Sequence, residues 1–442
     1  MPRSRPAISA VATAIAAMLA MPAPVAAQAT PQTTANHASA SAALTQRADD
    51  VVALLNGGGD PDALFAPAFL AQVPAERMRA ISAQIVQQYG RAERVTGIAP
   101  RDARSGTIDI ATERGTLHIL IGVAADPPHR IETLLVTGAE LSGDTMDAVT
   151  AEIRALPGTA SMVVARLGDG PPQPMAGIEP DRAMAIGSAF KLFILAELDR
   201  QVRAGQRHWA DVVPLDRRSA PSGILQAWPA GTPMTLQTLA TLMISISDNT
   251  ATDTLLHIAG RENVERMMTT IGVAAAPRNR PLLSTLELFA LKAAPQPAYD
   301  AWRNADEAGR RRLLARDYAA LDAAQLPADL LAGPPSRIDT LEWFASPMDL
   351  ARTMDWLRRE GSETARAILA VNPGGPALRG RFAYVGYKGG SEPGVIDLTW
   401  LLRDREGAWF VVTGAWNNPA AAVDEARFLG LMTRVATLVQ GS

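Results

Sequence analysis

The chain has 442 residues and a formal net charge of −3, with 48% hydrophobic and 20% charged residues. This length allows two domains or one large one, and the balanced charge gives no electrostatic reason to expect nucleic acid as a partner. The chain has no cysteine, which excludes thiol nucleophiles, disulfides and Cys-ligated metals, and its five histidines are not at metal-ligand spacing. We therefore expect no metal and no other cofactor.

Residues 1–29 are predicted to be a signal peptide. Arg3 and Arg5 form a basic start, residues 7–21 are largely apolar, and an A-x-A cleavage site ends at Ala29. A membrane anchor is the alternative, but the apolar run is short for a spanning helix and is followed by prolines. We expect a periplasmic or secreted protein, with no stable membrane insertion once the signal is cleaved.

A small α+β domain is predicted over residues 42–138. It follows residues 30–41, whose small polar side chains predict a disordered leader. Helical periodicity covers residues 42–55 and 76–89, and four strands follow over residues 92–98, 106–112, 116–123 and 130–136. A linker over residues 139–144 separates this domain from the rest of the chain.

The second predicted domain covers residues 145–442. Two strands follow its first helix, a long helical block fills the middle, and three strands and a helix beginning at Pro419 end the chain. One sheet must therefore be built from both ends of the domain.

The first chemical motif in this domain is Ser188-Ala189-Phe190-Lys191, at the start of a helix predicted over residues 188–202. The hydroxyl and the amine are three residues apart and so share a helix face. Apolar neighbours make Lys191 an unlikely solvated cation, so we expect it to accept the proton of a nucleophilic Ser188. A helix cap beside a surface lysine is the alternative.

The second motif, Ser247-Asp248-Asn249, follows a helix predicted over residues 236–245. Here Ser247 would relay a proton toward the leaving group, and the amide of Asn249 would contact the substrate and Lys191. Alone, the triplet also fits an ordinary polar turn at a helix end.

The third motif is Lys388-Gly389-Gly390, which is predicted to follow a strand ending at Tyr387. Glycine lets a backbone approach a ligand closely, so Gly390 and Ser391 are predicted to contact the substrate. The N–H groups of Ser391 and Ser188 would form an oxyanion hole. A lysine at an exposed strand end is the alternative for this motif.

Together, in this order, the three motifs resemble those of the class A β-lactamase and penicillin-binding family over roughly residues 145–440. The resemblance implies a β-lactamase-like domain, with an antiparallel sheet flanked by helices and an all-helical block. It also implies the catalytic set: Ser188 as the acylated nucleophile, Lys191 as general base, Ser247 as proton shuttle and Lys388 as electrostatic anchor. The two-domain layout is similar to the β-lactamase-like proteins of clavulanic acid gene clusters, whose first domain has an NTF2/steroid-isomerase-like fold.

Three departures from the family are visible. Leu282 stands where the family has the glutamate that activates water, and nearby Glu287, the candidate deacylation base, also fits a capping box with Ser284. Gly389 replaces a hydroxyl residue, for which Ser391 is a candidate substitute, and Asp397 with Leu398 replaces an arginine. About forty extra residues also lie roughly between positions 294 and 337.

The leading hypothesis is an exported serine hydrolase acting on β-lactams or related acyl esters, which are small-molecule acyl substrates. A D-alanyl-D-alanine carboxypeptidase or penicillin-binding protein is the second enzyme reading. A non-catalytic binding protein on the same fold is the third. The substituted Leu282 predicts slow deacylation in the first reading, because losing a general base costs about 10²–10⁴-fold.

Overall fold

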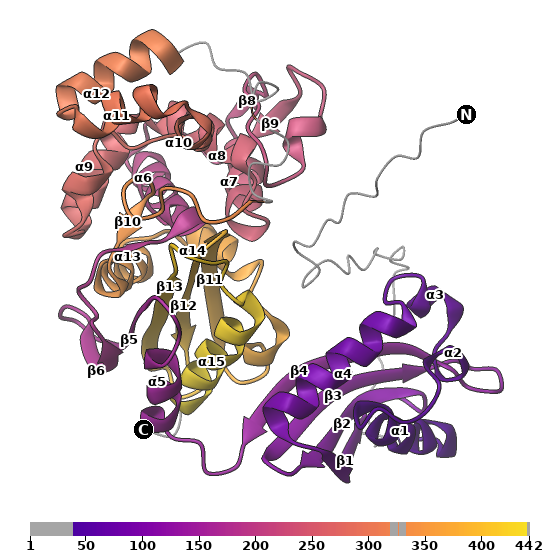
Figure 1. The fold of residues 1–442 in the computed structure, drawn as a ribbon. Coiled ribbons are helices and arrows are strands. Elements are labelled where there is room, and N and C mark those ends of the chain that lie inside the picture. Colours follow the sequence, from indigo (N-terminus) through magenta and orange to yellow (C-terminus); the bar gives the residue numbers. More distant parts are fainter. Residues whose placement is uncertain (1–38, 319–325, 327–332, 440–442) are drawn as a thin grey trace. The chain divides into compact units, whose positions relative to one another are not determined.

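The computed structural model describes residues 39–318, 326 and 333–439 (Figure 1). The predicted signal peptide over residues 1–29, and residues 30–38 of the predicted leader, lie outside the described residues. The chain divides into two compact units, Met1–Ser142 and Gly143–Ser442. No helix of the described residues is long and apolar enough to cross a membrane.

The first unit packs two long helices, α1 and α4, against a four-stranded antiparallel sheet of order β1-β2-β3-β4 (Figure 1). Buried and half-buried residues alternate strictly along β2 and β3. One face of the sheet therefore packs on the core, and the other face is half-buried. The elements are α1 (Ala42–Leu55), α2 (Pro61–Leu64), α3 (Pro67–Leu70), α4 (Ala75–Tyr89), β1 (Ala92–Pro100), β2 (Ser105–Thr112), β3 (Gly115–Val123) and β4 (Ile131–Leu141).

The ends of this unit differ from the prediction by a few residues. Ser41, assigned to the leader, is the N-cap of α1, and its side chain accepts a hydrogen bond from the Leu44 N–H at 3.1 Å. Strand β4 continues to Leu141, into the predicted linker over residues 139–144, because its last residues pair with the start of β3. The NTF2-like fold of this domain stays a prediction.

The second unit is built around a five-stranded antiparallel sheet of order β11-β12-β13-β5-β6. Its strands are β5 (Thr159–Leu167), β6 (Gln173–Ile178), β11 (Tyr384–Glu392), β12 (Val395–Arg403) and β13 (Trp409–Asn417). Strands from the start and the end of the unit meet where β13 pairs with β5. The mixed α+β fold of this domain and a sheet assembled from both of its ends are therefore confirmed.

Helices cover both faces of this sheet, which gives the unit two hydrophobic cores. Helices α5 (Met146–Arg154) and α15 (Glu425–Leu438) cover one face, and α6 (Lys191–Arg203) and α13 (Pro347–Arg359) belong to the core on the other (Figure 1). The surrounding helical block contains α7 (Leu236–Ser245), α8 (Asn249–Ala259), α9 (Arg261–Ile271), α10 (Thr285–Ala293), α11 (Gln296–Asn304), α12 (Glu307–Leu313) and α14 (Glu363–Ala370). Short strands β7 (Met184–Ala185) and β10 (Phe344–Ala345) pair with each other, as do β8 (Val212–Pro214) and β9 (Pro233–Thr235).

Three predicted boundaries in this unit are wrong. Lys388 does not follow a strand, because β11 continues through both glycines to Glu392. The last helix begins at Glu425 rather than Pro419, since Asp424 caps it by accepting from the Arg427 N–H at 2.9 Å. Ser188 lies in a 3₁₀ turn, η1 (Gly187–Phe190), and the α-helix starts only at Lys191.

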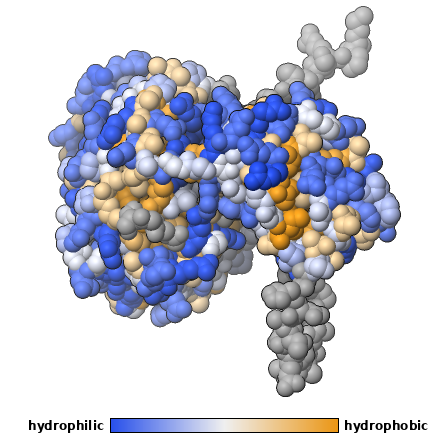
Figure 2. Space-filling view, turned by 90° about the horizontal axis from the view of Figure 1, so that it is seen from below, coloured by the Kyte–Doolittle hydropathy of each residue, from blue (hydrophilic) through white to orange (hydrophobic). Residues whose placement is uncertain are grey.

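The surface seen in Figure 2 is mostly hydrophilic, and hydrophobic residues gather in a few places on it. Among the described residues, the large hydrophobic side chains that are exposed include Ile224, Trp228, Ile246 and Val371 of the second unit. Ile224, Ile246 and Val371 lie on segments that include or contact residues 245–248.

Candidate active site

Two glycines bring the turn that carries Ser188 against strand β11. Gly187 has a φ of +46°, a left-handed conformation that L side chains rarely adopt. A Cβ on Gly390 would lie 2.3 Å from both the Ile186 carbonyl oxygen and the Ser188 nitrogen, so only glycine fits there. A Cβ on Gly187 would likewise lie 3.2 Å from the Ser391 nitrogen. The backbone nitrogens of Ser188 and Ser391 therefore belong to two segments in direct contact.

Lys191 lies at the centre of the candidate site and is 0% exposed. Its Nζ is 3.0 Å from Ser188 Oγ, 2.9 Å from Ser247 Oγ and 2.8 Å from Asn249 Oδ1. It also donates to the backbone carbonyl of Ser247 at 2.7 Å. One buried amine thus joins the first two sequence motifs.

The surroundings of Lys191 favour its neutral form. Burial is the main cause that lowers the pKa of Lys191 well below its ordinary value of 10.5, and the nearby charge of Lys388 lowers it further. Asp253 and Asp248 oppose this shift with their negative charges, but do not overcome it. A lysine amine that is neutral near neutral pH has a lone pair and can accept a proton.

Ser247 sits on a turn whose conformation is held by its neighbours. Its φ of +59° is uncommon for a residue with a side chain. The next residue, Asp248, is fully buried and caps α8 by accepting from the Ala251 N–H at 2.8 Å. The same carboxylate accepts from the N–H groups of Ile224 at 2.7 Å and Leu225 at 2.9 Å. This network holds the turn in place, so that the Ser247 hydroxyl lies within hydrogen-bond distance of the amines of Lys191 and Lys388.

Lys388 reaches the same hydroxyl from the opposite side of the site. Its Nζ is 3.1 Å from Ser247 Oγ and also donates to the Gly389 carbonyl oxygen. The side chain is buried, and this burial lowers the pKa of Lys388 to about 7, although the nearby Asp397 acts in the opposite direction. The structure therefore brings together Ser188, Lys191, Ser247 and Lys388, the four residues predicted to be catalytic.

The predicted substrate contacts lie beside this set, but two of their side chains already have partners. Besides accepting from Lys191, Asn249 donates through Nδ2 to the Ala220 carbonyl at 3.2 Å. The side chain of Ser391 lies beside the carboxyl of Glu425, at the start of α15, and acts to lower the pKa of that carboxyl. Since that hydroxyl faces α15, Ser391 is a poor substitute for the hydroxyl that Gly389 lacks.

The space beside Gly389 is already filled. A Cβ at this position would lie 2.1 Å from the hydroxyl oxygen of Tyr387, two residues earlier on the same strand. The Tyr387 ring lies 5.2 Å from the Trp400 ring, centroid to centroid, and its burial raises the pKa of the phenol. Glycine at position 389 is thus matched to a tyrosine at position 387.

Glu287, the candidate deacylation base, is fixed in a capping box at the start of α10. One carboxylate oxygen accepts from the Ser284 N–H at 2.8 Å, and the Ser284 side chain accepts from the Glu287 N–H at 3.2 Å. The other oxygen accepts from Arg261 at 2.7 Å. Both oxygens of Glu287 therefore have protein partners, and none of these belongs to the catalytic set.

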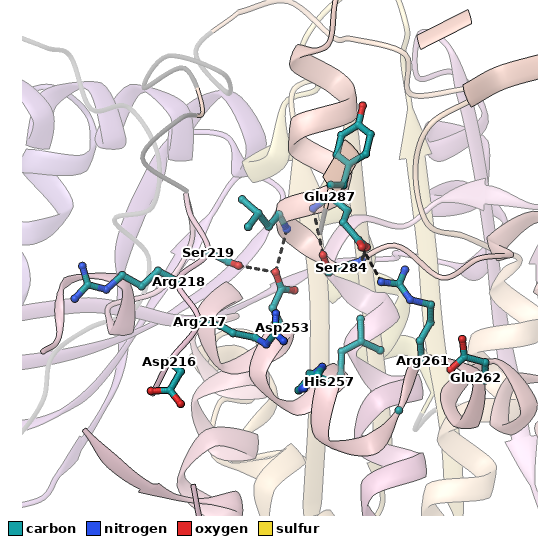
Figure 3. Close-up of a pocket in the computed structure, with 14 residues that line it drawn as sticks. Asp216, Arg217, Arg218, Ser219, Asp253, His257, Arg261, Glu262, Ser284 and Glu287 are labelled. Carbon is teal, nitrogen blue, oxygen red and sulfur yellow. Dashed lines mark hydrogen bonds and ion pairs between the residues drawn. The ribbon is translucent and has the colours of Figure 1, made fainter. Parts of the chain in front are cut away.

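Glu287 lines a cavity of about 750 Å³ between α8, α10 and the segment before Ser219. Figure 3 shows the side chains that line it. Asp253 lies on the wall of this cavity, where its carboxylate accepts from Ser219 Oγ at 2.5 Å and from the Thr285 and Leu286 N–H groups at 2.7 and 3.0 Å (Figure 3). The negative charge of Asp253 also acts on Lys191, where it raises the pKa of the amine. Burial raises the pKa of Asp253.

Asp253 is the residue near the site to which sequence reasoning assigned no role. It lies six positions after Ser247, inside the helix that the second motif begins. Asp253 is a carboxylate among the buried residues of α8. Its position could have indicated a role, since a buried carboxylate needs hydrogen-bond or charged partners. Within residues 39–318, 326 and 333–439, no group of three or more His, Asp or Glu side chains could hold a metal ion.

A family described as "Beta-lactamase enzyme family" matches residues 144–364, which is half of the chain and contains the first two motifs but not Lys388. No curated protein matches the sequence.

Similar solved structures include a β-lactamase from Sphaerobacter thermophilus, at 23% identity and a TM-score of 0.48, over 67% of this chain and 95% of that one. PBP-A is similar at 16% identity and a TM-score of 0.46, over 67% and 95% of the two chains. A β-lactamase from Chitinophaga pinensis is similar at 17% identity and 0.45, over 67% and 96%. On the extent of the family match, the chain belongs to the β-lactamase enzyme family and is a serine hydrolase of the β-lactamase type.

Proposed function

We propose that the protein is an exported hydrolase that forms an acyl-enzyme at Ser188 and opens β-lactams or related acyl esters. One observation carries the proposal: the fully buried amine of Lys191 lies 3.0 Å from the Ser188 hydroxyl. A lysine amine whose neutral form is favoured by burial, within hydrogen-bond distance of a serine, can activate that hydroxyl as a nucleophile.

Acylation follows from the contacts around Ser188. Lys191 accepts the hydroxyl proton while Ser188 Oγ attacks the substrate carbonyl carbon and forms a new C–O bond. The proton then passes from Lys191 through the Ser247 hydroxyl, 2.9 Å away, to the leaving atom as its bond to the carbonyl carbon breaks. Lys388, 3.1 Å from the same hydroxyl, favours proton release from Ser247 whenever it carries a positive charge.

The negative charge on the carbonyl oxygen needs donors during this step. The N–H groups of Ser188 and Ser391 are the candidate oxyanion hole, supported by the contact between Gly187 and Gly390 that joins their segments. Losing one such donor typically costs about 10²–10³-fold in rate.

Deacylation is expected to be the slow half of the reaction. Water must attack the Ser188 ester and lose a proton, and Glu287 is a weak candidate base because both its oxygens have partners. A long-lived acyl-enzyme also characterises the second reading, a D-alanyl-D-alanine carboxypeptidase or penicillin-binding protein. Slow deacylation by itself does not separate these two enzyme readings.

The test is time-resolved intact-mass spectrometry of the mature protein with a penicillin and a cephalosporin, beside Ser188→Ala. We expect an adduct of the substrate mass on wild type and none on Ser188→Ala. A decaying adduct with product release supports a hydrolase, a persistent one supports a penicillin-binding protein, and release of D-alanine from a cell-wall peptide identifies the carboxypeptidase. Equal ligand binding by both proteins without any adduct would replace the proposal with a binding protein.

Export is supported by the basic start, apolar run and A-x-A site of residues 1–29. Expression of the full chain in a Gram-negative host, followed by fractionation and N-terminal sequencing, tests it. We expect a mature chain that begins after Ala27 or Ala29 in the periplasm or medium. An uncleaved chain retained in the cytoplasm would contradict export.

A further inference from the structure

The segment of β11 that follows Lys388 has a carboxyl group on each of its faces. On one face, Asp397 stands opposite Gly390 in the β11–β12 register and shares that face with Lys388. On the other face, the carboxyl of Glu425 lies beside the side chain of Ser391. A substrate carboxylate bound beside this segment would therefore lie close to the charges of two carboxyl groups, Asp397 and Glu425.

Asp397 also removes the advantage that Lys388 would give to an anion. Its carboxyl is fully buried and accepts from Thr399 Oγ1 at 2.9 Å, while its other oxygen has no hydrogen-bond partner. Burial lowers the pKa of Lys388 and raises that of Asp397. When both groups are ionised, the negative charge of Asp397 offsets the positive charge of Lys388, which weakens the attraction of Lys388 for an anion.

Three exposed apolar side chains lie on segments that include or contact residues 245–248. Ile246, 43% exposed, directly precedes Ser247, and Ile224, 48% exposed, belongs to the segment whose N–H groups bind Asp248. Val371 is 49% exposed, and its neighbour Asn372 donates to the Ser245 carbonyl at 2.7 Å. The same loop reaches β11, because a Cβ on Gly374 would lie 2.6 Å from the Tyr387 ring.

We propose that the substrate is an acyl ester whose leaving group is uncharged and apolar, and that a leaving-group carboxylate is selected against. This inference rests on the proposed function, because Ser247 defines the leaving-group side only if it delivers the proton there. The Ser188 hydroxyl adds to the ester carbonyl, the bond to the leaving oxygen breaks, and that oxygen receives the proton from Ser247. An apolar alcohol or phenol is released against Ile224, Ile246 and Val371.

A pair of esters of one acid tests the proposal directly: the phenyl ester and the 3-carboxyphenyl ester of phenylacetic acid. The two leaving groups differ by a single carboxylate placed away from the reacting oxygen. We expect kcat/KM for the phenyl ester to be about tenfold or more above that of the carboxylated ester, since one unscreened like-charge contact costs from about 1 to 4 kcal/mol near a surface. Equal rates, or a faster carboxylated ester, would overturn the proposal.

Two variants with matched controls assign the effect. Glu425→Gln should raise kcat/KM of the carboxylated ester about threefold or more and leave the phenyl ester unchanged, whereas Glu406→Gln, on the β12–β13 turn, should change neither. Ile246→Ser should lower kcat/KM of the phenyl ester about threefold to tenfold, as expected for losing one apolar contact, while Met175→Ser, an equally exposed apolar residue on β6, should not. No change in either test variant would contradict the assigned residues.

Failure of this inference differs from failure of the proposed function. If the carboxylated ester reacts faster and Ser188→Ala abolishes the reaction, the acyl-enzyme stands and the leaving-group assignment falls. If Ser188→Ala turns over both esters at the wild-type rate, the proposed function itself is wrong.

Discussion

Two buried lysines share one serine hydroxyl in this protein. Lys191 and Lys388 approach Ser247 Oγ to 2.9 and 3.1 Å, and burial lowers the pKa of both amines. Two cations so close would repel each other, so each charge disfavours the other. This coupling favours the neutral form of at least one amine, and a proton relay through Ser247 needs an amine with a free lone pair.

Replacement of Lys191 tests its role as the base for acylation. We expect Lys191→Met to lower the rate of adduct formation about 10²–10⁴-fold, because the Ser188 proton loses its acceptor. The rate is measured by quenched-flow mass spectrometry, with circular dichroism to establish that the variant folds. A folded Lys191→Met variant that is acylated at the wild-type rate would exclude this lysine as the base.

Lys388 should make stability depend on pH with a definite sign. Its pKa is about 7 when folded and near its ordinary value of 10.5 when unfolded. Between these values the unfolded chain binds a proton that the folded chain does not, so the free energy of unfolding rises with pH, by at most about 1.4 kcal/mol per pH unit.

The comparison is between wild type and Lys388→Met in urea unfolding at pH 7, 8.5 and 10. The stability difference, wild type minus variant, should increase with pH. Loss of Lys388 also relieves its repulsion of Lys191, which weakens the pH dependence of the variant and acts in the same direction. A difference that stays constant would show that Lys388 keeps an ordinary pKa in the folded protein.

At the scale of elements, the contact between η1 and β11 determines whether the site forms. Gly390→Ala would place a Cβ 2.3 Å from two backbone atoms, so one segment must move. We expect a stability loss of about 1–3 kcal/mol and an acylation rate reduced about 10²-fold, since 1 Å misplacement has that effect. Gly380→Ala, with open space around its Cβ position, is the matched control for thermal melting and adduct formation.

The start of α10 decides between the two roles of Glu287. If Glu287 only caps the helix and pairs with Arg261, Glu287→Gln and Ser284→Ala should each cost about 1 kcal/mol of stability and leave the decay rate of the acyl-enzyme within twofold of wild type. The decay rate of both variants is measured on the penicillin adduct, and their stability on the free protein. Decay slowed about 10²-fold or more in Glu287→Gln, but not in Ser284→Ala, would instead identify the carboxylate as the base.

Local patterns predicted most elements of the fold, and the errors have physical causes. The helix over residues 236–245 matches α7 because an apolar stripe and a threonine cap act within one segment. The end of β11 was misplaced because Gly389 and Gly390 have low strand propensity, and pairing with β12 overrides it. Pro419 suggested a helix start, whereas Asp424 provides the capping side chain.

For the whole molecule, the motifs predicted which residues lie together, Ser188, Lys191, Ser247 and Lys388, because each residue type has a chemical role at a known spacing. The environment of the set was less predictable. Glu425 reaches Ser391 from the last helix, and Asp397 shares a face with Lys388 only through the β11–β12 register. Contacts between segments so far apart are set by packing, which short motifs do not encode.

The last prediction concerns the independence of the two units. The hydrophobic core of the first unit contains only residues from Leu44 to Ile131, and the two cores of the second contain only residues from Val149 to Val439. A unit with its own core can fold alone. Residues 143–442 expressed without the first unit should therefore unfold cooperatively on heating and form the Ser188 adduct within about twofold of the mature chain's rate. If this fragment instead folds but is acylated more than tenfold more slowly, the first unit contributes to catalysis. If the fragment is insoluble, the first unit is needed for folding.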